Sequence, residues 1–243
     1  MQASSLEQKV AIVTGAGRGI GRSIALALAR NGARVALAAR TVADLENVQA
    51  EIERLSGQAA CFPTDVQRES DVTALVHDTV ARFGRLDIVV NNAGMGIFGP
   101  LAELTTEQWD QIMAVNARGP FLLCREAIPY LRQQHAAFIL NIASVVGVKG
   151  YVNQSAYSAS KHALIGMSKA LAKEVQADGI RVHVLCPGGV DTEMISHSRP
   201  DLDRSVLMHP DEIADLVVFL VTRRGNAVID EIHLRRASST PWA

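Results

Sequence analysis

The sequence has almost no excess of charge of either sign. Its 24 lysines and arginines and its 25 aspartates and glutamates give a formal net charge of −1 over 243 residues. A surface that binds nucleic acid needs a basic excess, so this composition predicts no nucleic-acid partner.

Cysteines are few, and metal-binding motifs are missing. The three cysteines, Cys61, Cys124 and Cys186, are far apart in the sequence, and each lies among apolar residues. We therefore expect buried thiols in a reducing compartment rather than disulfides. The seven histidines form no His-Glu-x-x-His pattern, and no Cys-x-x-Cys pair is present, so we expect no metal site.

Long apolar runs are lacking as well. No apolar run reaches the length that crosses a membrane, and the N-terminus has no basic stretch followed by an apolar one. We therefore expect a cytoplasmic protein without a membrane partner.

Short runs of Val, Ile and Leu alternate with longer helical patterns along nearly the whole chain. Continuous apolar runs such as 88–90 are typical of parallel strands that are covered on both faces. The alternation predicts an α/β fold with a doubly wound parallel sheet, and no linker divides it, so we expect one domain over residues 1–243. The expected strands are 9–13, 34–38, 58–62, 86–90, 137–141, 180–185 and 228–232, and the expected helices are 19–31, 41–55, 68–83, 105–133, 154–177 and 210–222.

The segment 188–209 departs from this alternation. Its periodicity is weak, and it contains Ser196, Ser198 and Pro200. Because loops that follow strands often carry function in such folds, we expect it to be a substrate loop.

A glycine-rich turn follows the first expected strand and opens the first helix. It reads Thr14-Gly15-Ala16-Gly17-Arg18-Gly19-Ile20-Gly21. A helix N-terminus after such a turn directs backbone N–H groups and a positive dipole end at a pyrophosphate. The common Gly-x-Gly-x-x-Gly spacing fails at Ile20, the wider spacing of Gly15, Gly19 and Gly21 fits, and no Walker motif is present. We therefore expect a dinucleotide site.

The residue after the second strand indicates which dinucleotide binds. An acidic side chain there holds the ribose 2′-hydroxyl of NAD, whereas a basic one accommodates the 2′-phosphate of NADP. Arg40 occupies this place, and Arg18 lies in the glycine turn, so we expect NADP(H). The alternative is that Arg40 is a surface charge beside a helix that Thr41 caps.

Tyr157 and Lys161 are one helical turn apart, in a segment rich in alanine. Residues at i and i+4 share a helix face, and a nearby ammonium group lowers the pKa of a phenol. Such a pair can move protons to or from a substrate oxygen. On its own this spacing is also typical of an ordinary solvent-exposed helix.

Further motifs occur in order along the chain: Asn91-Asn92-Ala93-Gly94, then Ser144, then Pro187-Gly188. Together with the glycine spacing and the Tyr157/Lys161 pair they resemble the short-chain dehydrogenase/reductase family, in its compact single-domain branch. The closest similarity is to NADPH-dependent 3-oxoacyl-[acyl-carrier-protein] reductases. The resemblance implies a Rossmann fold of about seven strands, a homotetramer or dimer, and a catalytic set of Asn116, Ser144, Tyr157 and Lys161.

By the same resemblance, Tyr157 is the general acid in reduction, Lys161 lowers its pKa and binds the nicotinamide ribose, and Ser144 binds the substrate oxygen. The implied cofactor contacts lie at the carboxyl ends of strands, where open α/β sheets bind ligands. They are Gly15, Arg18, Gly19, Ile20, Gly21, Arg40, Asp65, Val66, Asn91, Ala93, Gly94, Tyr157, Lys161, Pro187, Gly188, Val190 and Thr192.

Asn116 also has an argument from the sequence itself. Pro120 has no N–H to donate, so the backbone carbonyl of Asn116, four residues earlier, loses its helical partner. A water bound there could link Lys161 to solvent as a proton relay. The alternative is a simple proline kink with Asn116 facing solvent.

The function expected from these observations is NADPH-dependent reduction of a ketone, with a 3-oxoacyl thioester as one candidate. Two alternatives remain: an NAD(P)-dependent dehydrogenase that oxidises a sugar, steroid or secondary alcohol, and a non-catalytic NADP-binding sensor. A serine hydrolase is excluded, because Gly166-Met167-Ser168-Lys169-Ala170 lacks the second glycine and lies within a helix.

The substrate walls are expected to come from the least patterned segments. Met194, Ile195 and Met208 are expected on one side, and Gly96, Ile97 and Phe98 on the other. The chain end differs from the family pattern after residue 232, and Trp242 belongs either to a free tail or to a contact with a second subunit.

Overall fold

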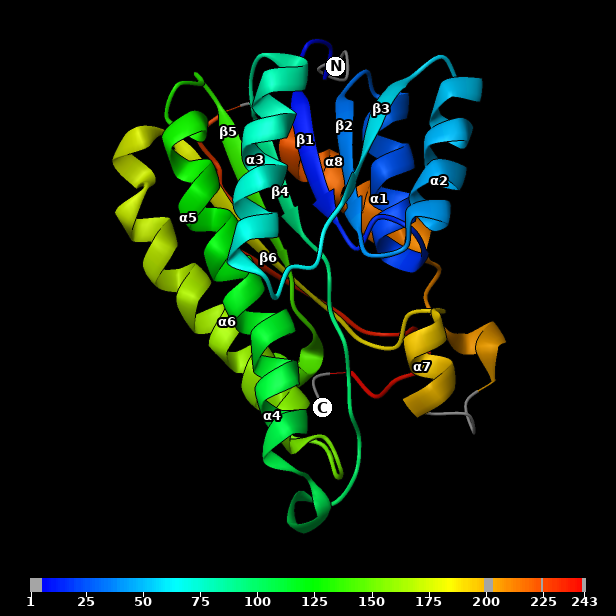
Figure 1. Ribbon diagram of the computed structural model, residues 1–243. Coiled ribbons are helices and arrows are strands. Elements are labelled where there is room, and N and C mark those ends of the chain that lie inside the picture. Colours follow the sequence, from blue (N-terminus) through cyan, green and yellow to red (C-terminus); the bar gives the residue numbers. More distant parts are fainter. Residues whose placement is uncertain (1–5, 199–202, 224, 242–243) are drawn as a thin grey trace.

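The computed structural model describes residues 6–198, 203–223 and 225–241 (Figure 1). Within them seven strands form one sheet in the order β3-β2-β1-β4-β5-β6-β7, and all neighbouring strands are parallel. The predicted doubly wound α/β fold is therefore confirmed. The strands are β1 (Val10–Thr14), β2 (Arg34–Ala39), β3 (Gln58–Pro63), β4 (Ile88–Asn91), β5 (Ala137–Ile142), β6 (Ile180–Pro187) and β7 (Glu231–Leu234).

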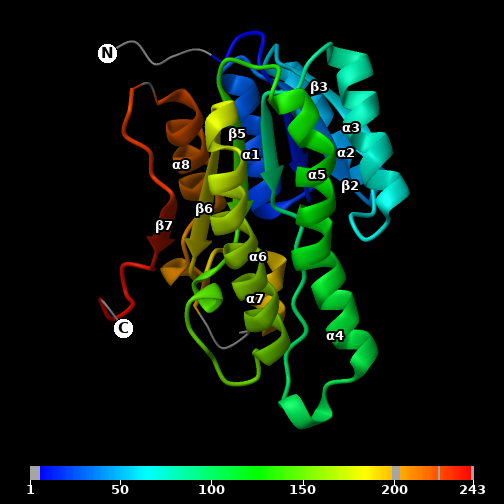
Figure 2. The same ribbon diagram turned by 90° about the vertical axis from the view of Figure 1, so that its left-hand side faces the viewer.

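Helices cover both faces of this sheet, as the two views show (Figures 1 and 2). On one face lie α1 (Gly19–Arg30), α2 (Val42–Arg54) and α8 (Pro210–Thr222); on the other lie α3 (Glu69–Phe83), α5 (Gly119–Leu131) and α6 (Ser155–Glu174). Successive strand residues alternate between the two layers: Ala11 and Val13 pack with α1, whereas Ile12 packs with α3 and α5. This two-sided burial explains the continuous apolar runs of the strands.

The segment expected as one helix over 105–133 is divided into three pieces. Helix α4 (Thr106–Met113) begins with a capping box between Thr105 and Gln108 and leads into a π-helical turn, η2 (Ala114–Arg118), which α5 continues. The N–H of Gly119 reaches back five residues to the carbonyl of Ala114. The irregularity thus begins ahead of Pro120, because the missing proline N–H is accommodated by widening the preceding turn.

Two further predictions need correction at the C-terminal end. The last strand lies at Glu231–Leu234 rather than at 228–232. The segment 188–209, which was expected to be a loop, contains in its described part a short helix, α7 (Glu193–Ser198), and a 3-10 turn at Arg204–Val206. A parallel bridge between Val190 and Met208 closes the loop at its base. Trp242 lies outside the described residues.

In the described part of the chain, no helix combines the length and apolar character needed to cross a lipid bilayer.

A buried carboxylate, Asp87, holds together the starts of β1 and β4, at the end of the sheet away from the glycine turn. Asp87 is fully buried and accepts hydrogen bonds from Lys9 Nζ (2.7 Å), the backbone N–H of Val10 (3.0 Å) and Arg85 Nε (2.8 Å). Both basic side chains reach it from partly exposed positions. A buried carboxylate with this many donors joins the start of β1 to the start of β4.

We predict that Asp87→Ala lowers the free energy of unfolding by roughly 2–4 kcal/mol, because it leaves two cations and a backbone N–H without their acceptor. Urea unfolding measures this change. The control is Asp178→Ala, which removes a more exposed partner of Arg132 and should cost no more than about 1 kcal/mol. Equal losses in the two variants would contradict the central role of Asp87.

Candidate active site

A cleft of about 1590 Å³ opens where the strands end. Most of the residues predicted to contact cofactor or substrate line it, whereas Gly21, Asn91 and Asn116 lie behind its surface. Segments far apart in the sequence therefore meet at this edge, as expected for a parallel sheet. The predicted residues that line the cleft are Gly15, Arg18, Gly19, Ile20, Arg40, Asp65, Val66, Ala93, Gly94, Ser144, Tyr157, Lys161, Pro187, Gly188, Val190 and Thr192.

The glycine turn needs its glycines for two physical reasons. Gly15 and Gly19 have φ angles of +64° and +53°, a region that side chains disfavour. A Cβ on Gly21 would lie 2.2 Å from the carbonyl oxygen of Gly15, so only glycine lets α1 start this close to β1. The turn is thus a narrow cradle with room for a ligand against its backbone.

Helix α1 begins at this cradle, and in the part of the chain that the structure describes no side chain caps the N–H groups of its first turn. Within the described residues, Arg18 at the N-cap makes no side-chain capping bond, and the first turn holds no acidic residue. The unsatisfied N–H groups and the helix dipole therefore favour an anion at this place. The arrangement fits the pyrophosphate of a dinucleotide.

Two polar residues hold the cradle against the next strand. The hydroxyl of Thr14 accepts from the N–H groups of Asn92 (3.0 Å) and Ala93 (3.1 Å), and the Asn92 side-chain amide donates to the Thr14 carbonyl (2.9 Å). Sequence reasoning assigned no role to Thr14 or Asn92, although both lie within the motifs it used. They fix the spacing between the turns after β1 and β4.

Arg40 and Arg18 both reach the cleft with exposed side chains. Arg40 follows β2 and lies next to the N-terminus of α2, and Arg18 forms an ion pair with Glu193 of α7. That ion pair links the glycine turn to α7. Asp44, in the first turn of α2, also lines this end of the cleft.

Asp65 and Asn91, both expected to contact the cofactor, lie in different places relative to the cleft. Asp65 lines the cleft, and its carboxylate accepts from the N–H of Gln67 at 3.1 Å. Asn91 is buried, and its amide donates to Asn141 Oδ1 at 2.8 Å. The structure therefore gives Asn91 a place inside the sheet rather than on the cleft wall.

Ser144 and Tyr157 lie together on the inner wall of the cleft. Ser144 follows β5, and its hydroxyl donates to the Pro187 carbonyl at 3.3 Å. The Tyr157 hydroxyl lies near that of Ser144, and Phe98 packs edge-on against the tyrosine ring at 5.7 Å between centroids. The loop after β4 thus covers the phenol from the outer side.

Lys161 is buried one turn further along α6. Its ammonium group donates to the carbonyl of Ile142 at 2.9 Å and lies 5.8 Å from the centre of the Tyr157 ring. Burial lowers the pKa of Lys161 to about 8 and raises the pKa of Tyr157 to about 12, although the bond to Ser144 opposes the latter shift. The net lowering of the phenol pKa that was expected is not found here, because desolvation, the largest contribution, raises it.

Asn116 is fully buried in the π-helical turn, so the alternative that it faces solvent is excluded. Its side-chain oxygen accepts from the N–H of Met95 (2.9 Å), and its amide donates to the Met95 carbonyl (2.8 Å) and to Ser160 Oγ (3.0 Å). Ser160 in turn donates to the Tyr157 carbonyl. Asn116 therefore ties the loop after β4 to the helix that carries Tyr157 and Lys161.

Four of the six residues expected in the substrate walls line the cleft. Met194, Ile195, Gly96 and Phe98 line the cleft, whereas Ile97 does not. Met208 is also absent from the lining, because it is buried in the core with α8.

One wall of the cleft was missed altogether by sequence reasoning. It consists of His233, Leu234, Arg235, Arg236 and residues 238–241. The Arg235 side chain donates to the carbonyls of Ser239 (2.8 Å) and Arg236 (3.1 Å), which folds this segment back on itself. The basic pair after β7 was visible in the sequence, but no periodic pattern placed it near the site.

Comparisons with known proteins agree with this geometry. A profile of the family described as short chain dehydrogenase matches residues 9–203. Among curated relatives, an uncharacterised oxidoreductase of Bacillus subtilis, YxjF, is 36% identical over 93% of this chain and 89% of its own length. The 3-oxoacyl-[acyl-carrier-protein] reductase FabG of Thermotoga maritima is 32% identical over 93% of this chain and 96% of its own length.

Two solved structures are similar over nearly the whole chain. An alcohol dehydrogenase from the archaeon Thermococcus sibiricus, complexed with 5-hydroxy-NADP, has a TM-score of 0.89 at 32% identity and covers 97% of this chain and 99% of its own. A metagenomic short-chain oxidoreductase in complex with NADP has a TM-score of 0.85 at 36% identity, covering 97% of this chain and all of its own.

We predict that Lys161→Met raises the free energy of unfolding at pH 7 and that its advantage over the unchanged protein shrinks as the pH rises. Between about pH 8 and 10.5 the unfolded chain holds a proton on Lys161 that the folded chain has lost. The free energy of unfolding of the unchanged protein therefore rises with pH over this range, by roughly 3 kcal/mol from this residue. Urea unfolding of both proteins from pH 7 to 10 measures the difference.

A group whose pKa is raised by folding, such as Tyr157, lowers the free energy of unfolding as the pH rises through its titration range. Both proteins contain Tyr157, so this contribution cancels in the difference between them. The control is Lys169→Met, which removes an exposed lysine of the same helix and should show no such trend. A constant difference for Lys161→Met would mean that the lysine is hydrated in solution.

Proposed function

Because the chain belongs to the short-chain dehydrogenase/reductase family, whose members are nicotinamide-dependent oxidoreductases, we propose that it is an NADPH-dependent carbonyl reductase. One observation carries this proposal: the partly buried Tyr157 phenol lies beside the Ser144 hydroxyl on the wall of the cleft, where desolvation raises its pKa to about 12. A phenol that keeps its proton at neutral pH is prepared to donate it, which reduction of a ketone requires.

The cradle of glycines and the uncapped start of α1 fit the pyrophosphate of the cofactor. When bound, the nicotinamide ring supplies the hydride that a carbonyl carbon accepts. The protein then has to orient the carbonyl group and stabilise the negative charge that develops on its oxygen.

Ser144 and Tyr157 perform that task in this proposal. The Ser144 hydroxyl turns from the Pro187 carbonyl to the substrate oxygen, while the Tyr157 hydroxyl donates to the same oxygen and transfers its proton. Two donors fixed in a partly closed cleft stabilise an alkoxide without reorganising during the reaction.

Lys161 stabilises what remains after proton donation. With a pKa of about 8 its ammonium group is charged at neutral pH, so it favours the Tyr157 phenolate and can donate to the ribose of the cofactor. Asn116 holds the surrounding loop and helix in place. Lys161 then gives a proton to the Tyr157 phenolate, and a water accepted by the Asn116 backbone carbonyl, which Pro120 cannot engage, returns a proton to Lys161.

NADPH is preferred over NADH because Arg40, rather than an acidic residue, follows β2. Arg40 receives the 2′-phosphate, and Arg18 adds a second positive charge. Two similar structures are complexes with NADP and 5-hydroxy-NADP, which supports this choice.

A 3-oxoacyl thioester is the first substrate to test, since the relative from Thermotoga maritima is named as a 3-oxoacyl-[acyl-carrier-protein] reductase. The second candidate is oxidation of a secondary alcohol, which the similarity to an archaeal alcohol dehydrogenase favours. Rates with a panel of ketones and alcohols, each with NADPH or NADP, separate the two directions.

We predict that Tyr157→Phe lowers kcat for ketone reduction by about 10²–10⁴-fold, because the proton donor is lost while the ring remains. NADPH binding, followed by fluorescence, should stay within a few-fold of the unchanged protein. Tyr130→Phe, on α5 beside His77 and away from the cleft, is the matched control and should retain full activity. Unchanged turnover in Tyr157→Phe would exclude the proposed proton donor.

We predict that Arg40→Asp weakens kcat/KM with NADPH by about 10–100-fold, because one charge-assisted contact to the 2′-phosphate is replaced by repulsion. The efficiency with NADH should change little or rise. Arg30→Asp, a charge reversal at the far end of α1, serves as the control. If the preference between the two cofactors does not change, the 2′-phosphate is recognised elsewhere.

A further inference from the structure

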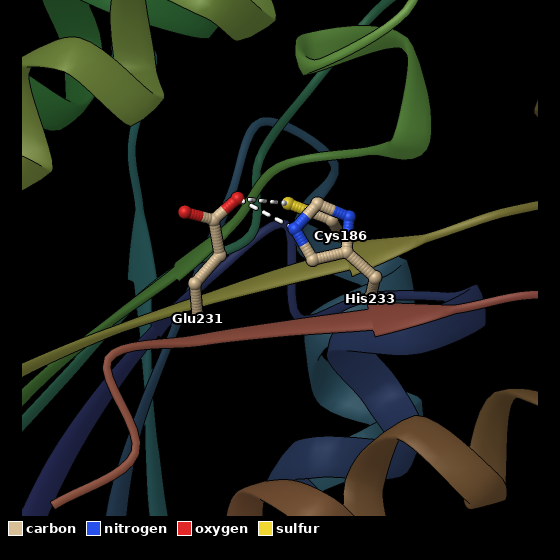
Figure 3. Close-up of side chains that lie close together, drawn as sticks. All are labelled: Cys186, Glu231 and His233. Atoms are coloured by element: carbon tan, nitrogen blue, oxygen red, sulfur yellow. Dashed lines mark hydrogen bonds and ion pairs between the residues drawn. The ribbon is translucent and has the colours of Figure 1, made fainter. Parts of the chain in front are cut away.

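Three side chains that bind metals well meet at the edge of the sheet, next to the C-terminal wall of the cleft, to which His233 belongs (Figure 3). They are Cys186 near the end of β6 and Glu231 and His233 of β7. Their ligand atoms all lie within 4.8 Å of one another. We propose that these residues form a binding site for a zinc-class divalent cation.

The strand register brings the three residues together. Cys186 is the direct partner of His233 in the parallel β6–β7 pair, and Glu231 lies two residues before His233. Because side chains alternate along a strand, Glu231 and His233 project from the same face as Cys186. That face is the one covered by α6, since Cys186 packs with Leu164 and Ile165.

The distances are close to those of a metal site. Cys186 Sγ lies 3.9 Å from Glu231 Oε1, and His233 Nε2 lies 2.7 Å from the same oxygen. With bonds of about 2.0–2.3 Å, tetrahedral ligand atoms around zinc lie roughly 3.4–3.6 Å apart. The observed distances fall on either side of these values, so small rotations of the Glu231 and His233 side chains suffice.

Both interactions converge on one carboxylate oxygen, each through a hydrogen. A cation takes over this bridging role: the thiol proton leaves to solvent, and the imidazole binds through Nε2 while its hydrogen lies on Nδ1. No oxidation or reduction is involved.

The ligand types select the class of metal. Thiolate sulfur and imidazole nitrogen with a single carboxylate favour zinc or cobalt, whereas magnesium and calcium require oxygen ligands. The His233 side chain is 49% exposed, so the fourth position opens to solvent and is filled by water.

The surroundings both support and limit the site. Lys169 Nζ lies 3.2 Å from Glu231 Oε2 and fixes the carboxylate so that Oε1 faces the other two ligands. The ammonium groups of Lys169 and Lys161 are the positive charges that face the cluster, and they make the site weaker than one with only neutral neighbours. The separation of 45 residues between Cys186 and Glu231 explains why no sequence motif reveals the cluster.

Cobalt(II) titration of the chelator-treated protein tests the proposal. We expect one equivalent per chain, a sulfur-to-cobalt charge-transfer absorption band, visible bands of tetrahedral intensity, and displacement of the cobalt by Zn²⁺. Zn²⁺ should also raise the thermal unfolding midpoint. No cobalt absorption and no zinc-dependent change in the midpoint would overturn the proposal.

Ligand variants locate the site. His233→Ala, at a half-exposed position where folding is not at risk, should weaken Zn²⁺ binding by more than about 100-fold, because even outer-shell partners of metals cost about 10–100-fold. Cys186→Ala should abolish the charge-transfer band. Cys61→Ala and His135→Ala, a half-exposed cysteine and an exposed histidine outside the cluster, should change neither. A band that survives in Cys186→Ala, or is lost in Cys61→Ala, would assign the metal to another cysteine and refute the proposed site.

Discussion

The parallel pairing of β1 with both β2 and β4 is the constraint on which the site depends. It makes the turns after these strands leave the sheet at one edge, side by side, and the chain then proceeds in opposite directions from them. Thr14 and Asn92 connect the two turns by hydrogen bonds, so the glycine cradle and the loop before Met95 share one rigid base. The later motifs reach the same edge because β5 and β6 continue the parallel order.

Burial decides the chemistry at the inner wall more than proximity does. Lys161 and Tyr157 are close enough to interact, yet desolvation dominates both pKa values. It lowers the pKa of Lys161 and raises the pKa of Tyr157, so it favours the uncharged form of each side chain. The Tyr157 phenol therefore keeps its proton at neutral pH, whereas the Lys161 ammonium group loses its proton more readily than an exposed lysine does. Such a pair stabilises charge after it has formed rather than before.

Much of this could be predicted from the sequence, because the relevant signals are local. Glycine spacing, apolar runs and the i, i+4 relation of Tyr157 and Lys161 each depend on a few neighbouring residues. The failures at the site involve contacts over long distances: the burial of Met208 under α8, the position of Asn91 inside the sheet, and the wall formed by residues 233–241. The pKa of Tyr157 belongs to this group too, since Phe98 and Ser144 come from other parts of the chain.

The position of β7 has a consequence for how the protein is made. This strand and the folded-back segment after it are synthesised after the other six strands, yet they form one wall of the cleft and pair only with β6 in the described chain. A nascent chain on the ribosome can therefore assemble the sheet and the glycine cradle while the cleft is still open on one side. The wall formed by residues 233–241 is thus completed after the glycine cradle during biosynthesis.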